Sequence, residues 1–436
     1  MSSSAPFAHR LLSPVGSSSD ATPLGWSAKL ARKIVVSALS QITDGQLAIL
    51  DRTDGSTFRF GSSRGDRTLT ANLEVLHPSF WTALLSRGSL GSGESWTEGA
   101  WTCDDLTRLV RLMLRNRSAL EGLDGGFAKL ASPFLRFLHW RNANTRDGSR
   151  RNIAAHYDLG NEFFAAFLDP TMCYSSGIFE SDAATMEQAS VAKIDRLCRR
   201  LELTADDHLL EIGTGWGALA MHAARNYGCR VTSTTISREQ FEGARQRVAA
   251  AGLRDRVEIL CSDYRDLSGT YDKLVHCEMV EAVGAKFLDG FLGKCAALLR
   301  DGGRMAMQAI TIADSHYRRA LSEVDFIKRY IFPGSFIPSA TALIGSATVS
   351  AGFRLLQQED FGQHYARTLA HWRDRMYQNL DEIRAMGKSD AFLRQWEFYL
   401  CYCEGGFAEG WLGLSQMLFE RPALGRSPRS AGGVRG

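Results

Sequence analysis

The chain has 436 residues, of which 44% are hydrophobic and 23% are charged, and its formal net charge is +3. This length is enough for two or three domains, and so mild a charge does not by itself indicate a nucleic-acid partner. The nine cysteines are dispersed, without a CxxC pair or metal-ligand spacing, which is typical of reduced thiols in a cytoplasmic protein. No apolar run is long enough to span a bilayer and no signal-peptide core is evident, so we expect any membrane contact to be peripheral.

The first third of the chain predicts a small α+β domain. Residues 1–22 are Ser-rich and predicted to be disordered, and the domain is expected over residues 23–137. Residues 45–61, GQLAILDRTDGSTFRFG, alternate apolar and polar positions around an Asp-Gly pair, which predicts a β-hairpin. Asp104 to Leu114 predicts an amphipathic helix capped by Asp104. The basic stretch within residues 138–152 predicts a linker, either a solvated loop or a contact for phospholipid headgroups.

The second domain is expected over residues 153–420, where strand and helix patterns alternate. Strands are predicted at 208–212, 229–235, 257–260, 273–277 and 304–310, with helices beginning at Ala218, Arg238 and Ala285. This order predicts a mostly parallel sheet with helices on both faces and ligands at the carboxyl ends of its strands. Beyond Ile312 the chain is expected to form an aromatic-rich helical cap, followed by a disordered basic tail at 421–436.

The segment LLEIGTGWG at residues 209–217 carries the clearest chemical signal. An apolar run ends at an acidic residue, and Gly213, Gly215 and Gly217 follow at alternate positions. Glycines let the backbone turn tightly and approach a ligand closely. The spacing differs from the GxGxxG of dinucleotide sites and the loop has no Walker lysine, so the segment favours S-adenosylmethionine (SAM) over a phosphate-bearing ligand. The structural alternative is a strand–helix turn without a ligand.

Several separated segments together resemble the cyclopropane-fatty-acyl-phospholipid synthase family of SAM-dependent methyltransferases. They occur in the family's order at residues 156–180, 210–220, 234–240, 263–267, 278–284, 329–339, 364–372 and 399–407. The resemblance spans about residues 28–420 and implies a Rossmann-like methyltransferase sheet with a helical cap that lines an apolar acyl-chain tunnel. It also implies a phospholipid substrate, because members that act on phospholipids carry a small first domain.

The resemblance implies a set of cofactor-binding residues after three successive strands. These are Glu211, Gly213, Thr214, Gly215, Trp216 and Gly217 for the methionine part of SAM, Thr235, Ser237 and Gln240 for the ribose, Asp263 and Tyr264 for the adenine, and Tyr174 and Ser175 as a closing pair. Trp216 could instead pack a helix, and Thr235 or Ser237 could cap one.

The family's reaction starts when a cis double bond attacks the sulfonium methyl group and leaves a carbocation. Loss of a proton from the new methyl group then closes a cyclopropane ring, so the site must exclude water and place a base nearby. In the family that base is a bound bicarbonate, and the positions that hold it correspond to Glu281, Tyr365, Gln308, Ser176 and the backbone at Ile310.

Two of these positions depart from the family pattern, because Gln308 replaces a histidine and Ser176 a cysteine. Both can still donate hydrogen bonds, but Gln cannot relay a proton as His can. A cyclopropane product is expected. If the proton leaves from a neighbouring chain carbon, the product is a methylene- or methyl-branched chain, completed by a partner reductase or dehydrogenase.

Cys403 occupies a position often regarded as catalytic in the family, although this mechanism needs no thiolate. His156 could lie near the cofactor or be structural, and no metal site is predicted. The alternatives are an amine N-methyltransferase and a non-catalytic lipid- or SAM-binding protein. The expected setting is a homodimer in the cytoplasm, peripheral at the inner face of the membrane and without a nucleic-acid partner.

Overall fold

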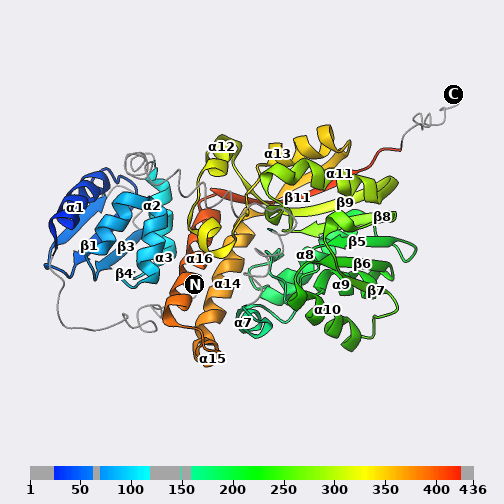
Figure 1. Cartoon of the computed structure of the whole chain (residues 1–436), viewed down its shortest axis with the longest axis horizontal. Coiled ribbons are helices and arrows are strands. Elements are labelled where there is room, and N and C mark those ends of the chain that lie inside the picture. Colours follow the sequence, from blue (N-terminus) through cyan, green and yellow to red (C-terminus); the bar gives the residue numbers. More distant parts are fainter. Residues whose placement is uncertain (1–23, 62–68, 118–147, 149–158, 424–436) are drawn as a thin grey trace.

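The computed structural model describes residues 24–61, 69–117, 148 and 159–423 (Figure 1). The segment 1–22, the predicted linker apart from residue 148, His156 and the tail from residue 424 lie outside the described residues. The described chain forms two sheets, one in the N-terminal part and one in the C-terminal part, with long helices between them.

The N-terminal part is a four-stranded sheet, in the order β2-β1-β3-β4, packed with three helices. Its elements are α1 (Trp26–Leu39), β1 (Gln46–Asp51), β2 (Thr57–Gly61), β3 (Thr70–Val75), α2 (Ser79–Thr97), β4 (Trp101–Cys103) and α3 (Leu106–Arg115). Strands β1 and β2 pair in antiparallel fashion, which confirms the predicted hairpin, whereas β1 and β3 are parallel. The sheet is anchored by buried Asp51, whose carboxylate accepts hydrogen bonds from Arg32 and from the indole of Trp81.

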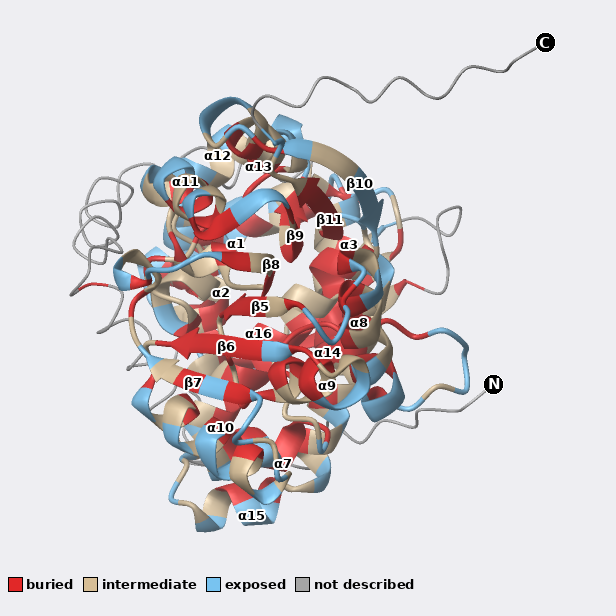
Figure 2. Cartoon of the chain, turned by 90° about the vertical axis from the view of Figure 1, so that its right-hand side faces the viewer, coloured by how far each residue is buried: buried red, intermediate tan, exposed pale blue. Residues whose placement is uncertain are grey.

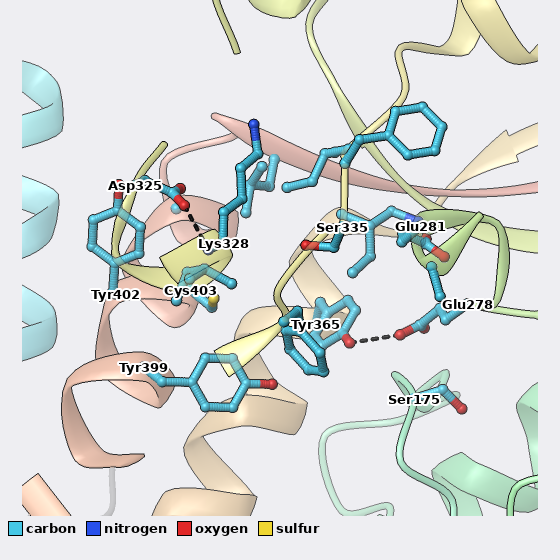
Figure 3. Close-up of a pocket in the computed structure, with 18 of the residues that line it drawn as sticks. Ser175, Glu278, Glu281, Asp325, Lys328, Ser335, Tyr365, Tyr399, Tyr402 and Cys403 are labelled. Carbon is cyan, nitrogen blue, oxygen red and sulfur yellow. Dashed lines mark hydrogen bonds between the residues drawn. The ribbon is translucent and has the colours of Figure 1, made fainter. Parts of the chain in front are cut away.

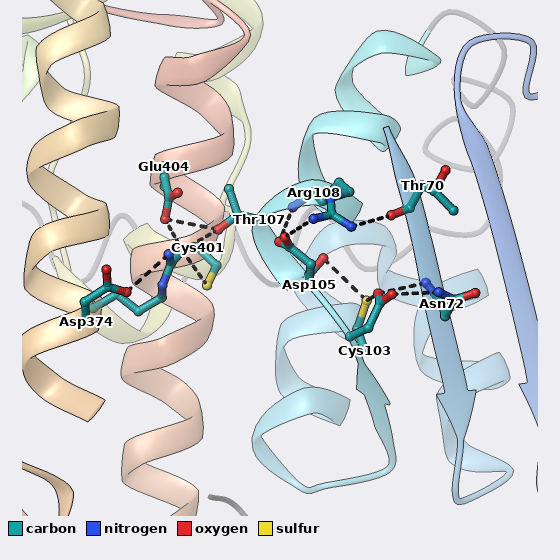
Figure 4. A network of polar contacts seen from close by, with 11 residues as sticks. Thr70, Asn72, Cys103, Asp105, Thr107, Arg108, Asp374, Cys401 and Glu404 are labelled. Atoms are coloured by element: carbon teal, nitrogen blue, oxygen red, sulfur yellow. Dashed lines mark hydrogen bonds and ion pairs between the residues drawn. The ribbon is translucent and has the colours of Figure 1, made fainter. Parts of the chain in front are cut away.

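The predicted cap of helix α3 was wrong by one residue. The side chain of Asp105 accepts the hydrogen bond from the backbone N–H of Arg108 at 2.8 Å, as an N-cap does (Figure 4). Asp104 instead accepts from the backbone and side-chain amides of Asn72 on β3. Asp104 and Asp105 could each cap the helix, because both carry a carboxylate. Asp104 is instead bonded to Asn72 of the sheet, so Asp105 is the cap.

The C-terminal part contains a seven-stranded sheet in the order β10-β11-β9-β8-β5-β6-β7. Its strands are β5 (His208–Ile212), β6 (Arg230–Thr235), β7 (Val257–Cys261), β8 (Tyr271–Cys277), β9 (Leu299–Ile312), β10 (Arg354–Asp360) and β11 (Leu412–Glu420). The five predicted strands are confirmed, and β5 has the predicted bounds. Strands β5 to β9 pair with one another in parallel, and β11 is antiparallel to both β9 and β10.

Two strands lie where only helices were expected, since β10 and β11 both follow Ile312. Strand β11 is buried on both faces, so its sequence LGLSQMLFE lacks the polar–apolar alternation that marks a half-exposed strand. Strand β10 forms the exposed edge of the sheet (Figure 2) and carries the polar run Gln357 to Asp360. The segment after β9 is therefore part helix and part sheet.

Helices cover both faces of this sheet. The helices described in the C-terminal part are α7 (Asn161–Phe167), α8 (Met186–Leu201), α9 (Ala218–Tyr227), α10 (Arg238–Ala250), α11 (Leu288–Leu298), α12 (Asp314–Ser322), α13 (Ala340–Gly345), α14 (Gly362–Gln378), α15 (Leu380–Ala385) and α16 (Asp390–Ala408). Short turns of helix are η2 (Tyr264–Asp266), η3 (Val280–Ala282), η4 (Ala285–Phe287), η5 (Ile327–Ile331) and η6 (Ser346–Ser350). Leu210 faces the apolar cluster that contains α11, and Leu209 faces the cluster that contains α8 and α9, as alternation along a strand requires.

Helices α14 and α16 lie between the two sheets (Figure 1), and α16 packs against α2 and α3. One continuous apolar cluster joins the N-terminal sheet to these helices and to α7. Polar contacts reinforce the junction, because Thr107 of α3 donates to Glu404 of α16, which also pairs with Arg373 of α14 (Figure 4). Shared packing of this kind fixes the N-terminal part against the helices that border the site.

Candidate active site

The glycine-rich turn after β5 adopts backbone conformations that suit glycine. Gly213, Gly215 and Gly217 have φ values of 102°, 52° and 85°, which L-residues with side chains rarely adopt. A Cβ atom built on Gly215 would meet nothing within 4 Å. The turn borders a cavity of about 950 Å³, so the bare backbone of Gly215 faces open space at the carboxyl end of the sheet. This surface fits the close backbone approach that SAM requires.

Glu211 is the penultimate residue of strand β5, just before this turn, and is buried. Its carboxylate accepts a hydrogen bond of 2.5 Å from the Ser233 hydroxyl, which also lies 2.7 Å from the hydroxyl of Thr214. Burial raises the pKa of Glu211 to about 8. A bound ligand ammonium would favour the ionised carboxylate and offset this burial cost.

The polar residues after β6 and β7 lie beside the same cavity. Thr235, Gln240, Asp263 and Tyr264 line it, and the hydroxyl of Thr235 donates to the Gln240 side chain at 2.9 Å. Ser237 does not line the cavity, and its hydroxyl accepts from the backbone N–H of Gln240 at the start of α10. In the structure Ser237 therefore serves as a helix cap.

The remaining predicted cofactor residues are the pair Tyr174 and Ser175 and three residues of the turn itself. Tyr174, Ser175, Thr214 and Trp216 line the cavity, whereas Gly217 does not. The hydroxyl of Tyr174 lies 3.0 Å from that of Tyr399, and the hydroxyl of Ser175 accepts from buried Lys193 at 2.6 Å. These contacts hold the Tyr174–Ser175 segment against α8 and α16.

A carboxylate that the sequence analysis did not single out lies at the centre of the site. Glu278 directly follows β8, and its side chain accepts three hydrogen bonds, of which Figure 3 draws the one from Tyr365. The backbone N–H of Ser176 and the side-chain amide of Gln308 donate to one oxygen, at 2.9 and 2.8 Å, and the Tyr365 hydroxyl donates to the other at 2.6 Å.

The backbone at Glu278 is strained, with φ of 49°. This conformation costs a residue with a side chain of order 1–3 kcal/mol and is common at functional sites. Its backbone N–H donates to the carbonyl of Gln308 at 2.7 Å, which holds the residue in place. The side chain of Gln308 is oriented in turn by Gln416 of β11, whose amide donates to the Gln308 oxygen at 2.9 Å.

Glu281 is the second buried carboxyl group of this cluster and also borders the cavity (Figure 3). One of its oxygens accepts the backbone N–H of Ile310 at 2.6 Å, and the other has no hydrogen-bond partner within the described part of the chain. Burial, together with the negative charge of Glu278, raises the pKa of Glu281 to about 8. Glu281 is therefore mainly protonated near neutral pH.

The structure thus brings together the five positions predicted for the base site, which come from four separate segments because Gln308 and Ile310 share β9. Glu281, Tyr365 and Ile310 line the cavity, whereas Gln308 and Ser176 lie behind Glu278. The only signal for Glu278 in the sequence is an acidic residue at the end of a predicted strand, within EMVEAVG. Sequence separation concealed its role, because its partners lie at 176, 308 and 365.

Cys403 lines another part of the cavity, with Tyr402, Asp325 and Lys328 (Figure 3). Burial raises the pKa of its thiol, which disfavours a thiolate nucleophile. Within the described residues, no group of three His, Cys, Asp or Glu side chains could hold a metal ion. Over the same residues, we found no helix with the length and apolarity needed to span a membrane.

The cavity continues from the glycine turn to the N-terminal part of the molecule. Its far wall consists largely of apolar side chains from α2, α3 and the segment between them, including Leu84, Leu90, Leu106, Leu109, Val110 and Met113. A polar cofactor surface, a carboxyl cluster and an apolar wall therefore share one space.

Comparison with known proteins agrees with this geometry. Residues 144–417 match the family model described as mycolic acid cyclopropane synthetase. The chain belongs to this family. It is 40% identical over 336 residues to the tuberculostearic acid methyltransferase of Mycobacterium tuberculosis, covering 76% of this chain and 78% of that protein. It is 34% identical over 353 residues to the cyclopropane-fatty-acyl-phospholipid synthase of Escherichia coli, covering 80% and 88%.

A solved mycolic acid cyclopropane synthase in complex with SAH and CTAB is 29% identical, with a TM-score of 0.58. The match covers 62% of this chain and 98% of that chain. The protein is therefore a SAM-dependent C-methyltransferase of the lipid-modifying type, and its seven-stranded sheet is the methyltransferase fold of these neighbours. Its glycine turn and the polar residues after β6 and β7 are the groups that would hold SAM.

Proposed function

We propose that this protein transfers the methyl carbon of SAM to a cis double bond in the acyl chain of a membrane phospholipid. The observation that carries the proposal is the single cavity that joins the glycine turn to an apolar wall, with a carboxyl cluster beside it. SAM supplies an electrophilic methyl group when bound. The chain's own residues hold the alkene in an apolar space, exclude water from the cation and accept a proton.

The site that loses the proton decides the product. Loss from the added methyl group closes a cyclopropane ring, whereas loss from a chain carbon leaves a methyl branch beside a double bond. We favour the branched, unsaturated product, because Gln308 and Ser176 depart from the bicarbonate-site pattern and because the relative at 40% identity is named for tuberculostearic acid. A saturated branch would require a separate reductase.

A cyclopropane product is the second candidate, and the relative of Escherichia coli supports it. Expression in a host that is rich in monounsaturated phospholipid and lacks its own synthase separates the two. The two products can be isomers, so the purified fatty acid methyl esters are compared by NMR. We expect olefinic and branched-methyl signals, and ring protons without them would contradict the branched product.

The surface of helix α1 supports a membrane location. Trp26, Leu30 and Ile34 recur every four residues and are 80%, 46% and 36% exposed, beside exposed Lys29 and Lys33. An apolar stripe flanked by lysines fits the headgroup region of an anionic bilayer. We infer that α1 docks the protein peripherally on the cytoplasmic face of the membrane. The homodimer implied by family resemblance stays a prediction.

The alternatives from other classes have less support. An amine N-methyltransferase has no need of so large an apolar wall, contributed in part by α2 and α3. A non-catalytic binding protein has no need of a strained glutamate held by three donors beside the cofactor surface.

A further inference from the structure

Glu278 occupies the position that family resemblance assigns to an external base. The resemblance places bicarbonate among Ser176, Gln308, Tyr365, Glu281 and Ile310. In the structure the backbone N–H of Ser176, the amide of Gln308 and the hydroxyl of Tyr365 all donate to the Glu278 carboxylate. The backbone N–H of Ile310 donates to Glu281. The donors expected to hold bicarbonate are thus engaged by carboxyl groups of the chain itself.

The Ser176 hydroxyl offers no replacement donor for a free anion. It donates to the carbonyl of Gly177 at 3.0 Å and lies 3.3 Å from the hydroxyl of Thr368, and its residue is fully buried away from the cavity. Glu278 itself lines the cavity, whereas Gln308 and Ser176 do not. The group that these donors present to a substrate is therefore the Glu278 carboxylate.

The backbone supports the same conclusion. At φ of 49° the position suits glycine, yet the chain places a long acidic side chain there. The strain turns the side chain back toward β9 and α14, where Gln308 and Tyr365 meet it. If this turn served the fold alone, glycine would adopt its backbone conformation at lower cost. We therefore attribute the glutamate at this position to a function of its carboxylate.

The charges around Glu278 suit a proton acceptor. Burial raises its pKa, while the hydrogen bond from Tyr365, the positive charge of Lys193 and the other two donors oppose that rise. Glu281 faces it from η3, and burial keeps that carboxyl group mainly protonated near neutral pH. The two carboxyl groups lie beside the place where a sulfonium and later a carbocation would lie, and an ionised Glu278 would stabilise that positive charge.

We propose that Glu278 is the built-in base of this enzyme and takes the role that bicarbonate has in the resembling family. This inference rests on the proposed methyl transfer. The π electrons of the alkene form the new carbon–carbon bond as the methyl–sulfur bond breaks, and the sulfur keeps the bonding pair. The cation then loses one proton to a Glu278 oxygen, and the electron pair of that C–H bond forms the new double bond or closes the ring. The protonated Glu278 returns its proton to solvent after product release.

The test measures transfer of labelled methyl groups from SAM to vesicles of monounsaturated phospholipid, in buffer freed of carbon dioxide and in the same buffer with added bicarbonate. We expect the wild-type rate to be the same in both buffers. Glu278→Gln keeps the shape but cannot accept the proton, and we expect its rate to fall at least about 100-fold while SAM affinity by equilibrium dialysis changes less than about threefold.

Glu278→Gly provides a second, rescuable variant. It removes the carboxylate, relieves the backbone strain and leaves Gln308, Tyr365 and the Ser176 N–H facing an anion-sized space. We expect bicarbonate or formate to restore part of its activity, with no such effect on Glu278→Gln, whose side chain fills the space. The matched control is Glu202→Gly, because Glu202 has φ of 53° at the end of α8 but lies on the surface, paired with Arg304. Its activity should equal that of the wild type.

The outcomes distinguish this inference from the function on which it rests. A wild-type rate that collapses without bicarbonate, or Glu278→Gln with near wild-type turnover, would overturn the role of Glu278 and leave methyl transfer standing. A folded, SAM-binding wild type that labels no lipid would overturn the proposed function and this inference with it.

Discussion

At the scale of single residues, the proposed cofactor surface depends on the absence of a side chain at Gly215. Its Cβ would point into the cavity, and its φ of 52° is unfavourable for alanine. Gly55, in the turn between β1 and β2, has φ of 76° and equally open surroundings but lies far from the cavity. We expect Gly215→Ala and Gly55→Ala each to cost about 1 kcal/mol of stability.

Only Gly215→Ala should weaken SAM binding, by more than about tenfold, because the alanine methyl group would occupy space that the ligand needs. Chemical denaturation and isothermal titration calorimetry of both variants check this pair. Equal SAM affinity in the two variants would show that the ligand does not lie against this turn.

Glu281 links the site to the pH dependence of stability. The pKa of Glu281 is about 8 in the folded protein and 4.5 when the side chain is not buried, as in the unfolded chain. Between these two pH values the folded state therefore binds more protons than the unfolded state. Stability from this group is therefore present below about pH 4.5 and is lost as the pH rises through about 8. Glu211, Glu397 and Glu404, with pKa values raised to about 8, 7 and 7, add slopes of the same sign.

Replacing Glu281 by Gln keeps an acceptor for Ile310 and removes the buried charge. We expect Glu281→Gln to be more stable than the wild type at pH 8.5 by at least about 1 kcal/mol, with a smaller difference at pH 5.5. Urea unfolding at both pH values gives the comparison. A difference that stays constant with pH would mean that Glu281 does not titrate in this range.

Residue types at the cofactor site were predictable because they follow strands directly. Glu211 and the glycines come at the end of β5, and the polar groups after β6 and β7 are next in order. Ser237 and Gly217 were placed among the ligand-binding residues but do not line the cavity, because a cap and a turn use the same residue types. Glu278 could not be assigned from sequence, since its role depends on which distant donors surround it.

At the scale of elements, the junction between the two parts of the molecule is the crossing of α16 over α3. A Cβ atom on Gly405 of α16 would lie 2.7 Å from the Val110 side chain of α3, closer than packing allows. Gly293 of α11 is also within a helix, but its Cβ would meet nothing within 4 Å.

Gly405→Ala should therefore destabilise the protein by about 1–3 kcal/mol, as overpacking does, whereas Gly293→Ala should be neutral or stabilising by up to about 1 kcal/mol. Thermal unfolding of the two variants provides the measurement. Equal effects would contradict a close α16–α3 contact in solution.

The elements that sequence predicted best are those with a single clear period or a flanking turn. The parallel strands β5 to β9 are short apolar runs, and the β1–β2 hairpin alternates around Asp-Gly. Strands β10 and β11 were missed because one is a polar edge and the other is buried on both faces, so neither alternates. Strand β11 pairs with β9, about a hundred positions earlier in the chain, and β10 pairs only with β11, so local pattern does not encode either pairing.

At the scale of the whole molecule, the N-terminal part contributes to the cavity and also carries the helix that we propose for membrane docking. Its helices α2 and α3 supply an apolar wall of the cavity, while α1 presents Trp26 and Leu30 on the outer surface. We expect Trp26→Ser with Leu30→Ser to reduce sedimentation with anionic vesicles at least about fivefold, because exposed apolar area and adjacent lysines drive such binding.

The control for docking is Val349→Ser, which removes another exposed apolar side chain, 85% exposed, from η6. It should leave vesicle binding unchanged. SAM affinity should be the same in all of these variants. Equal sedimentation of the α1 variant and the control would place the membrane contact elsewhere on the surface.

The central claim is methyl transfer to an unsaturated acyl chain, and one measurement tests it most directly. The full-length protein is incubated with SAM labelled with ¹³C in its methyl group and with vesicles of a cis-monounsaturated phospholipid, and the extracted lipid is examined by NMR. We expect the label in a carbon bonded to the acyl chain at the former double bond. Verified SAM binding with no label in the acyl chain, or with label only in an amine headgroup, would contradict the claim.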